Sequence, residues 1–450
     1  MIIKGGTVGV LLLSLALASA SSRALAVEDR QMLVVPKDHA IPEGASAHVM
    51  GLHARGLVER HIPGPEVLVV RVPDHETPNA FRERLLATGD FAIVETDRLV
   101  RPASAGAAST DQFAFRQWHL PHLRAAEAWA RVPSNAPAPI IAVLDTGIDR
   151  DHPDLIDRLV PGYNAATQLR EIDGGEVEDI NGHGTRCAGI AAATTHNGIG
   201  VASIAPNARI MPVRVTNKVS GSASLSALFD GIRYAADNGA RVVTVSYAGV
   251  SSGTAEVTAA YARTQGCMVV WSTDNFGFDY SWFDHPSITI VASTDQSDTL
   301  MANVSTGSAV DIVAPGKSIY STARNGSYNY DSGVSYATPI VAGAAALLLS
   351  INPSLSPEQI ETILLATSQD LGETGEDAVY GAGLVQPELA AFASGATADF
   401  DGDGQTTITD FVLYLNAWST SDARADVNLS GVVDLSDFSV YLGSWSEQSL

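Results

Sequence analysis

Apolar runs alternate with helix-like patterns through the middle of the chain, from Asp111 to about Phe392. Three of these runs, at residues 140–144, 242–245 and 268–271, consist almost entirely of apolar and β-branched residues. Strands without a polar side are typical of a parallel sheet that helices cover on both faces. The pattern therefore predicts an α/β domain at residues 111–393, with a doubly wound, mostly parallel sheet and helices on both faces.

A shorter pattern precedes this domain. Residues 27–110 contain two alternating apolar runs, at 32–35 and 67–72, and a helix-like segment at 81–86. Such runs indicate a small α+β unit. The unit ends at residues 101–110 in a stretch of mostly small residues, which predicts an open linker that proteases can reach.

The first 26 residues have the pattern of an export signal. Lys4 precedes an apolar stretch at residues 9–18, and small residues follow, so cleavage is expected after Ala20 or Ala26. This stretch, like the apolar run at 341–349, is shorter than the about 20 residues that cross a bilayer as a helix. We expect a secreted protein without a membrane span, and an uncleaved anchor is the alternative.

The composition limits the number of domains and the choice of partners. A chain of 450 residues is too long for one ordinary hydrophobic core, so two or three folding units are expected. The 50 acidic residues outnumber the 27 Lys and Arg, and the resulting charge of −23 repels nucleic acids and anionic membranes. The same charge suits a soluble protein with cation-binding sites.

Three short segments carry the candidate chemistry. Asp145 ends an apolar run, and doubly wound sheets keep their functional residues at this end of the strands. His183 lies between two glycines at the start of an expected helix, and Ser335 precedes an apolar helical run at 340–347. The N-terminus of a helix favours a developing negative charge. Taken alone, Asp145 or Ser335 is equally typical of a helix cap.

Together these segments resemble the three signatures of the subtilase family of serine endopeptidases. Asp-Thr-Gly-Ile-Asp begins at Asp145, His-Gly-Thr-x-x-Ala-Gly begins at His183, and Gly-x-Ser-x-Ala-Thr-Pro contains Ser335, in the order found in subtilisin. The similarity runs from about Gln117 to Pro387. It implies that Ser335 attacks the peptide carbonyl, that His183 transfers the proton and that Asp145 orients His183. It also implies that residues 27–110 are a propeptide, which assists folding and inhibits the enzyme until it is cut.

The same resemblance implies an oxyanion donor and a substrate-binding edge. Asn275 falls where the family has the amide donor of its oxyanion hole. Two segments, at 220–223 and 246–249, resemble the strands that hold an extended peptide, although surface turns rich in small residues are the alternative. The residues expected to bind substrate are Gly221, Ser222, Ser246, Tyr247, Ala248, Gly249 and Asp274.

Two departures from the family's pattern concern the rate of the reaction. Asp274 stands where the family usually has Gly, and its carboxylate is expected to oppose the oxyanion or to line the substrate pocket. Val334 and Tyr336 flank Ser335, so the supporting hydroxyl of a preceding Thr is absent. An alternative function is therefore a catalytically impaired subtilase that acts as a binding or scaffold module.

The chain has two cysteines, Cys187 and Cys267. Cys187 lies one helical turn past His183, whereas Cys267 lies on an expected strand well before Asn275, so we expect no disulfide between them. The resemblance, here to members like proteinase K, implies that Cys187 is a buried free thiol beneath His183.

After a short linker at 394–398, the tail at 399–450 contains a repeat. Residues 399–418 and 426–445 align at an offset of 27 and share Asp-Phe-x-x-Tyr-Leu-x-x-Trp. Each repeat offers oxygens at positions one, three, five, nine and twelve of a loop with Gly at position six, which is the spacing of a calcium loop. The expected ligands are Asp399, Asp401, Asp403, Thr407, Asp410, Asp426, Asn428, Ser430, Asp434 and Asp437. A solvated acidic tail is the alternative, but it does not account for the matched apolar residues.

The tail resembles a type I dockerin, which implies two bound Ca²⁺ ions and a cohesin-like partner. It departs from a full EF-hand, because its twelfth loop residue is Asp and no helix enters either loop. Since so short a segment has little core, we expect a small α-helical domain that needs calcium to fold. A further calcium site is expected at Asp154 and Asn197, with Asp111 nearby, although ordinary turn chemistry explains these residues almost as well. The whole pattern predicts an extracellular or cell-surface protein that cleaves proteins or peptides.

Overall fold

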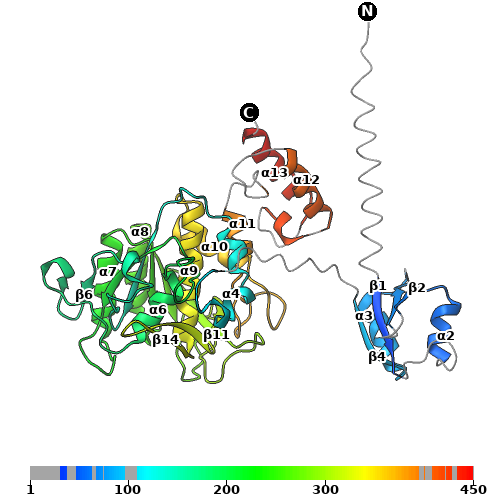
Figure 1. The fold of residues 1–450 in the computed structure, drawn as a ribbon, viewed down its shortest axis with the longest axis horizontal. Helices are drawn as coiled ribbons and strands as arrows, with labels where there is room; N and C mark the ends of the chain where they lie inside the picture. Colours follow the sequence, from blue (N-terminus) through cyan, green and yellow to red (C-terminus); the bar gives the residue numbers. More distant parts are fainter. Residues whose placement is uncertain are drawn as a thin grey trace, which may run out of the picture. The chain divides into compact units, whose positions relative to one another are not determined.

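The computed structural model describes residues 31–37, 47–62, 67–73, 75–96, 109–394, 400, 408–420, 422–427 and 433–448. The chain forms two compact units, Met1–Ser104 and Ala105–Leu450 (Figure 1). The division between them falls inside the predicted linker at 101–110. The predicted export signal, residues 1–26, lies outside the described residues.

In its described residues, the first unit combines a four-stranded antiparallel sheet with two helices. Its elements are β1 (Gln31–Pro36), α2 (Ala47–Ala54), β2 (Val58–Ile62), β3 (Val67–Arg71), α3 (Pro78–Ala87) and β4 (Phe91–Thr96). The strands lie in the order β2-β3-β1-β4. Alternate residues of the strands, such as Met32 and Val34 on β1 and Leu68 and Val70 on β3, form a buried cluster with Phe81 of α3. The period of two places one face of the sheet against the helices.

An eight-stranded sheet forms the centre of the second unit. In spatial order its strands are β12 (Ile312–Pro315), β11 (Ile288–Thr294), β10 (Met268–Ser272), β9 (Val242–Val245), β5 (Ile140–Asp145), β8 (Arg209–Arg214), β6 (Tyr163–Asn164) and β7 (Leu169–Arg170). All neighbouring strands are parallel except β6 and β7. The predicted α/β domain with a mostly parallel sheet is therefore confirmed, with one antiparallel pair at its edge.

Helices cover both faces of this sheet (Figure 1). Ile141 and Val143 of β5 join the buried cluster of α6 (His183–Ala192) and α9 (Val334–Ile351). The residues between and after them, Ala142 and Leu144, join the cluster of α7 (Leu225–Asp237) and α8 (Gly253–Thr264). Since successive strand residues point to opposite faces, the two clusters lie on opposite sides of the sheet, as predicted.

Shorter elements complete the second unit. They are η1 (Ala114–Arg116), α4 (His119–His122), α5 (Ala125–Trp129), η2 (Ile156–Arg158), η3 (Glu171–Asp173), the hairpin of β13 (Ile319–Ala323) and β14 (Ser327–Asp331), α10 (Pro357–Ala366) and α11 (Pro387–Ser394). α11 packs against α5, α9 and α10. Ser394, predicted to begin a linker, is instead the buried last residue of α11.

α9 is the central helix of the larger cluster. Among the residues that the structure describes, it alone is long and apolar enough to cross a membrane, and 89% of it is buried in the protein. Its apolar composition is that of a helix enclosed by sheet and helices rather than by water.

The part of the tail that the structure describes forms two similar helices, α12 (Ile408–Ser419) and α13 (Leu435–Gln448), with the short η4 (Ala423–Ala425) between them. Tyr414 and Tyr441 occupy equivalent positions in the two repeats, and their rings stack with centroids 3.7 Å apart. The flanking contacts are also equivalent, Phe411 with Trp445 at 5.3 Å and Trp418 with Phe438 at 5.4 Å. The repeat of 27 residues in the sequence is thus a pseudo-two-fold arrangement of aromatic side chains.

Candidate active site

Asp145 and His183 meet where β5 ends and α6 begins. Nδ1 of His183 lies 2.8 and 2.9 Å from the two carboxylate oxygens of Asp145, which is almost fully buried. The close approach requires glycine at position 184. A Cβ on Gly184 would lie 2.2 Å from the carbonyl oxygen of Gly147 and 2.9 Å from Cβ of Asp145. The glycine that follows the histidine therefore allows the helix to pack against the strand.

A second buried carboxylate, Asp179, holds the start of α6. It accepts hydrogen bonds from the backbone N–H groups of Gly182 and Thr185 at 2.8 and 3.0 Å. It also accepts one from the hydroxyl of Thr146 at 2.8 Å, and so it connects the end of β5 to the turn that carries His183. The sequence patterns did not single out Asp179. The one feature of the sequence that points to Asp179 is its position just before the start of a helix, where free N–H groups need an acceptor.

Ser335 is the second residue of α9. Pro339, four residues later, has no N–H, so the carbonyl of Ser335 lacks its usual helical partner. This carbonyl accepts a hydrogen bond from Oγ of Ser246 at 2.9 Å and lies 3.5 Å from Sγ of Cys187. The hydroxyl of Ser335 lies 3.5 Å from the carbonyl oxygen of Ser246. The proline thus allows two neighbouring elements to hold the first turn of α9.

Cys187 links the histidine and serine segments. Its Sγ is 3.9 Å from Nδ1 of His183 and also contacts the carbonyl of Ser335. On the other side, the ring of Tyr336 lies 5.6 Å from the ring of His183. Cys187 and Cys267 are both buried and free, so the prediction that they form no disulfide is confirmed.

The charge of Asp145 governs the protonation of His183. Burial has the largest single effect on the pKa of His183 and lowers it, but the charge and hydrogen bond of Asp145, together with the contact with Cys187, hold this pKa well above its ordinary value. Burial raises the pKa of the Cys187 thiol, so the thiol is neutral near pH 7 and places no negative charge beside His183. An imidazolium formed at His183 is therefore stabilised mainly by Asp145.

Asn275 lies just beyond β10 and is exposed. Its side-chain oxygen accepts a hydrogen bond from the backbone N–H of Val334 at 3.2 Å. With its oxygen engaged there, the Asn275 amide offers its Nδ2 as a donor beside the first turn of α9. Val334 makes this contact through its backbone, so the contact does not require the Thr that the family commonly has.

Asp274 precedes Asn275 and is 6% exposed. Its carboxylate accepts hydrogen bonds from the hydroxyls of Tyr280 and Ser305 and from the N–H of Phe276. The carboxylate oxygens are thus occupied by donors of the protein itself.

The two predicted substrate-binding segments contact each other. The hydroxyl of Tyr247 donates a hydrogen bond to the carbonyl oxygen of Gly221 at 2.7 Å, and the carbonyl of Tyr247 accepts one from Nε1 of Trp271 at 2.6 Å. Burial raises the pKa of Tyr247 far above its ordinary value, so the phenol stays neutral and can donate. Gly221 and Gly249 have φ values of 79° and 118°, a backbone region that favours glycine.

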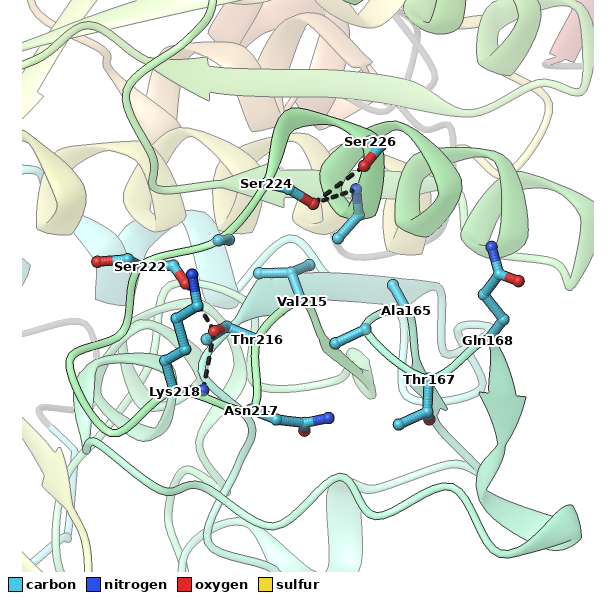
Figure 2. A pocket seen from close by; sticks show the side chains of 13 residues that line it. Ala165, Thr167, Gln168, Val215, Thr216, Asn217, Lys218, Ser222, Ser224 and Ser226 are labelled. Atoms are coloured by element: carbon cyan, nitrogen blue, oxygen red, sulfur yellow. Dashed lines mark hydrogen bonds between the residues drawn. The ribbon is translucent and has the colours of Figure 1, made fainter.

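A polar cavity of about 450 Å³ lies beside this edge. Figure 2 shows Ser222 and Lys218 at one end of the cavity and Gln168 at the other. Ser224 lines it at the start of α7, where its hydroxyl accepts the N–H of Ala227 at 3.2 Å. Three separate segments form the cavity, so no single sequence pattern predicts it.

The predicted cation site of the second unit gathers carboxylates around one loop. Nδ2 of Asn197 donates a hydrogen bond to Asp154 at 3.0 Å, and Asp111 accepts the N–H groups of His196 and Gly198 at 2.9 and 3.1 Å. Burial raises the pKa of Asp154. Carboxylate oxygens are ligands that Ca²⁺ prefers, but Asn197 turns its nitrogen rather than its oxygen toward Asp154. Calcium binding here stays a prediction.

The predicted calcium loops of the tail fall mostly outside the described residues. Asp410 and Asp437, the twelfth residues of the two predicted loops, are described and fully buried. Asp426 and Asp434 are also described, and the N–H of Asp434 donates to Asp437 at 2.9 Å. The predicted ligands outside the described residues are Asp399, Asp401, Asp403, Thr407, Asn428 and Ser430.

Comparisons with known proteins agree with this geometry. Residues 137–383 match the family described as "Subtilase family". Thermitase of Thermoactinomyces vulgaris is 39% identical over 267 residues, which cover 58% of this chain and 92% of thermitase. Subtilisin Savinase of Lederbergia lenta is 38% identical over 257 residues, which cover 56% of this chain and 89% of that protein. A solved structure of proteases from Pseudoalteromonas arctica superposes with a TM-score of 0.55 at 29% identity, over 64% of this chain and 100% of that one.

Proposed function

The chain belongs to the subtilase family and is a serine endopeptidase, and on this premise we propose that Asp145, His183 and Ser335 form its catalytic triad. The main support is the contact of His183 Nδ1 with both oxygens of the buried Asp145. This contact lies at the carboxyl edge of the sheet, and Cys187 touches both His183 and the first turn of α9. Asn275 is proposed as the oxyanion donor, because its side-chain oxygen is held by Val334.

In the proposed reaction, the Ser335 hydroxyl attacks the scissile carbonyl carbon while Nε2 of His183 accepts the hydroxyl proton. The carbonyl oxygen becomes negative and is stabilised by Nδ2 of Asn275 and by N–H groups at the start of α9. His183 then gives the proton to the leaving amine, and water releases the acyl group by the same route. Asp145 stays ionised throughout and stabilises the imidazolium.

The substrate is proposed to bind as an extended peptide between the segments at 220–223 and 246–249. The hydrogen bond from Tyr247 to Gly221 supports this, since it holds the two segments at a fixed separation. Ser222 and Ala248 are exposed and Gly221 and Gly249 are half-buried, so this edge is accessible to a peptide. Asp274 is buried, its carboxylate is bonded to Tyr280, Ser305 and Phe276, and it is not proposed to touch the substrate.

The triad is tested by incubating the purified protein with casein and comparing wild type with Ser335→Ala. We expect the substitution to abolish casein cleavage, and a serine-directed phosphonate to label wild type but not the variant. Cleavage that persists in Ser335→Ala would remove Ser335 as the nucleophile. Asp145 and His183 variants that retain full activity would likewise exclude the proposed triad.

We further propose that the protein is exported as a zymogen and acts outside the cell or at its surface. The separate compact unit Met1–Ser104 supports this, because it has its own buried cluster and joins the rest of the chain at the predicted linker. In this scheme the unit is removed by cleavage between residues 101 and 110. The Ser335→Ala protein should then accumulate uncut if the enzyme performs this cleavage itself.

The tail is proposed to be a calcium-folded tether for a cohesin-like partner. Its pseudo-two-fold aromatic cluster and the buried carboxylates Asp410 and Asp437 support this proposal. Ca²⁺ would be held by the two loops and would neutralise the buried carboxylates at the start of α12 and α13.

The alternative function is a catalytically impaired subtilase that serves as a binding or scaffold module. Two features of the sequence favour it, Asp274, whose charge is expected to oppose the oxyanion, and Val334, which supplies no hydroxyl beside Ser335. A wild-type protein that neither cleaves casein nor reacts with the phosphonate would support this alternative.

A further inference from the structure

Asp274 occupies a buried site made for its carboxylate. The hydroxyl of Tyr280 donates to one oxygen at 2.5 Å, while the hydroxyl of Ser305 and the N–H of Phe276, at 3.1 Å, donate to the other. Tyr280 is 5% exposed and Ser305 is fully buried. Hydrogen bonds to an ionised acceptor are strong, and burying an unpaired carboxylate is costly. The three hydrogen bonds therefore stabilise the conformation of the segment that contains Asp274.

The same segment is paired with a second one through its backbone. The N–H of Ser305 donates to the carbonyl oxygen of Asp274 at 3.0 Å, and the N–H of Thr306 donates to that of Phe278 at 3.0 Å. Ser305 also accepts the N–H of Phe278 at 2.8 Å through its hydroxyl. Ser305 therefore holds Asp274 by both its backbone and its side chain, and fixes the turn that follows Asn275.

The pairing requires glycine at position 307. A Cβ on Gly307 would lie 2.5 to 2.6 Å from backbone atoms of Tyr280 and Ser281, and the φ of Gly307 is 128°. The two backbones are therefore in direct contact beside Tyr280. With this contact, the residues on both sides of Asn275 are tied to the same neighbouring segment.

Asn275 is held from two directions. Val334 fixes its side-chain oxygen from the first turn of α9, and the hydrogen bonds of Asp274 fix its backbone from the end of β10. A donor of an oxyanion hole acts only when it is held at the place where the negative oxygen forms. We propose that Asp274, through Tyr280 and Ser305, is a positioning residue that holds Asn275 as the oxyanion donor. This inference rests on the proposed function, in which Asn275 stabilises the oxyanion.

If the Asp274 carboxylate positions Asn275, removing its charge should have the opposite effect on kcat from that expected if the charge opposes the oxyanion. If Asp274 opposed the oxyanion, then Asp274→Asn and Asp274→Gly would raise kcat. If Asp274 positions Asn275, both substitutions should lower kcat about tenfold or more, because Asn replaces one of the two acceptor oxygens with a donor and Gly removes both. Turnover of a chromogenic peptide, expressed per site that reacts with the phosphonate, measures the difference and corrects for protein that fails to fold.

Tyr280→Phe is the sharper variant, because it removes one hydroxyl and leaves the buried ring. We expect kcat to fall about tenfold with little change in KM, since the substrate edge is not touched. The affinity for a peptide boronate, which mimics the tetrahedral intermediate, should fall by the same factor. Ser305→Ala should act in the same direction.

A double-mutant cycle separates positioning from general damage. Asn275→Ala alone should lower kcat by about 10²–10³-fold, the magnitude known for subtilisin. In that background Tyr280→Phe should cost less than about twofold, because the donor that Tyr280 helps to position is gone. Equal slowing in both backgrounds would overturn the inference, and so would wild-type or faster turnover in Asp274→Asn.

Tyr163→Phe is the matched control. Tyr163 is also a buried tyrosine whose hydroxyl donates to a carboxylate, that of Asp230, at 2.5 Å. It lies on β6, which β9, β5 and β8 separate from β10. The kcat of Tyr163→Phe should match that of wild type. A fall in kcat comparable to that of Tyr280→Phe would also overturn the positioning role. A wild type that the phosphonate does not label would instead refute the proposed function, and this inference with it.

Discussion

Three buried carboxylates surround the proposed active site, and their different partners give them different effects. Asp145 faces the imidazole of His183, Asp179 faces backbone N–H groups at the start of α6, and Asp274 faces two hydroxyls. Only the first lies against a group that changes its charge during catalysis. The other two carboxylates hold backbone segments in place, because each is fully occupied by donors that do not ionise in the working range of pH.

Asp145→Asn tests the electrostatic role of the first carboxylate. The pKa of His183 is raised well above its ordinary value, and only the neutral imidazole can accept the Ser335 proton, so wild-type activity should rise as the pH passes upward through this pKa. In the variant, burial acts on His183 without the opposing charge. We expect the acidic limb of the profile to move to lower pH and kcat to fall about 10⁴-fold, as in other Ser-His-Asp proteases.

The measurement is kcat/KM from about pH 5 to about pH 10 for both proteins. An acidic limb that keeps its position in Asp145→Asn would show that Asp145 does not set the protonation of His183. Asp230→Asn is a suitable control, because Asp230 accepts from Tyr163 and lies on α7, away from His183.

The sequence predicted the three residues that are proposed as the triad, but it predicted neither Asp179 nor the buried partners of Asp274. Asp145, His183 and Ser335 each lie in a local motif, so a short stretch of sequence identifies them. The role of Asp274 depends on Ser305, which is 31 residues away, and that of Asp179 depends on the packing of α6 against β5. Hydrogen bonds between distant residues leave no local pattern, and this is why the sequence predicts Asp274 at the oxyanion or in the substrate pocket rather than against Tyr280.

Among the individual strands, those buried on both faces could be predicted from the sequence, and the short strands at the edge could not. The runs at 140–144, 242–245 and 268–271 became β5, β9 and β10, since a strand covered on both faces has a continuous apolar sequence. β6 and β7 have only two residues each, and their pairing depends on the edge of β8. No periodicity can be recognised over so few residues.

Pro339→Ala tests the first turn of α9. The alanine supplies an N–H that can bond the carbonyl of Ser335, in competition with Ser246 and Cys187. We expect kcat to fall about tenfold, because the hydroxyl of Ser335 shifts with its backbone, while the Tm stays equal or rises.

Pro357→Ala is the control for this variant. Pro357 lies at the first position of α10, where a missing N–H costs no helical hydrogen bond. It should leave both kcat and the Tm nearly unchanged. A Pro339→Ala enzyme with wild-type turnover would show that the freed carbonyl does not position the nucleophile.

At the scale of the whole molecule, the apolar residues divide into separate clusters of very different size. The two clusters on the faces of the large sheet are extensive, whereas the tail cluster has few buried residues among those that the structure describes. A small cluster provides little free energy of folding against the loss of chain entropy. We therefore predict that the tail depends on calcium for its folding more than the remainder of the second unit does.

Removal of calcium should loosen the tail of the full-length protein. In the Ser335→Ala variant, which cannot digest itself, we expect a chelator to make α12 and α13 sensitive to an added protease and to reduce the helical circular dichroism. Asp410→Ala with Asp437→Ala should be sensitive without chelator. Asp422→Ala, whose carboxylate pairs with Arg424 outside the loops, should respond like the parent. A tail that resists protease equally with and without chelator would contradict its need for calcium.

The burial of α9 has a consequence for the lifetime of the enzyme. Local opening exposes segments with few buried contacts, whereas this helix carries Ser335 in its first turn and is enclosed along 89% of its length. We therefore expect the proposed nucleophile to stay in place until the domain unfolds as a whole. A protease is always surrounded by copies of itself, and a molecule that opens only globally is cut by its neighbours at the rate of that opening. Substitutions that slow unfolding should accordingly delay autolysis, even where they lie far from the scissile bond.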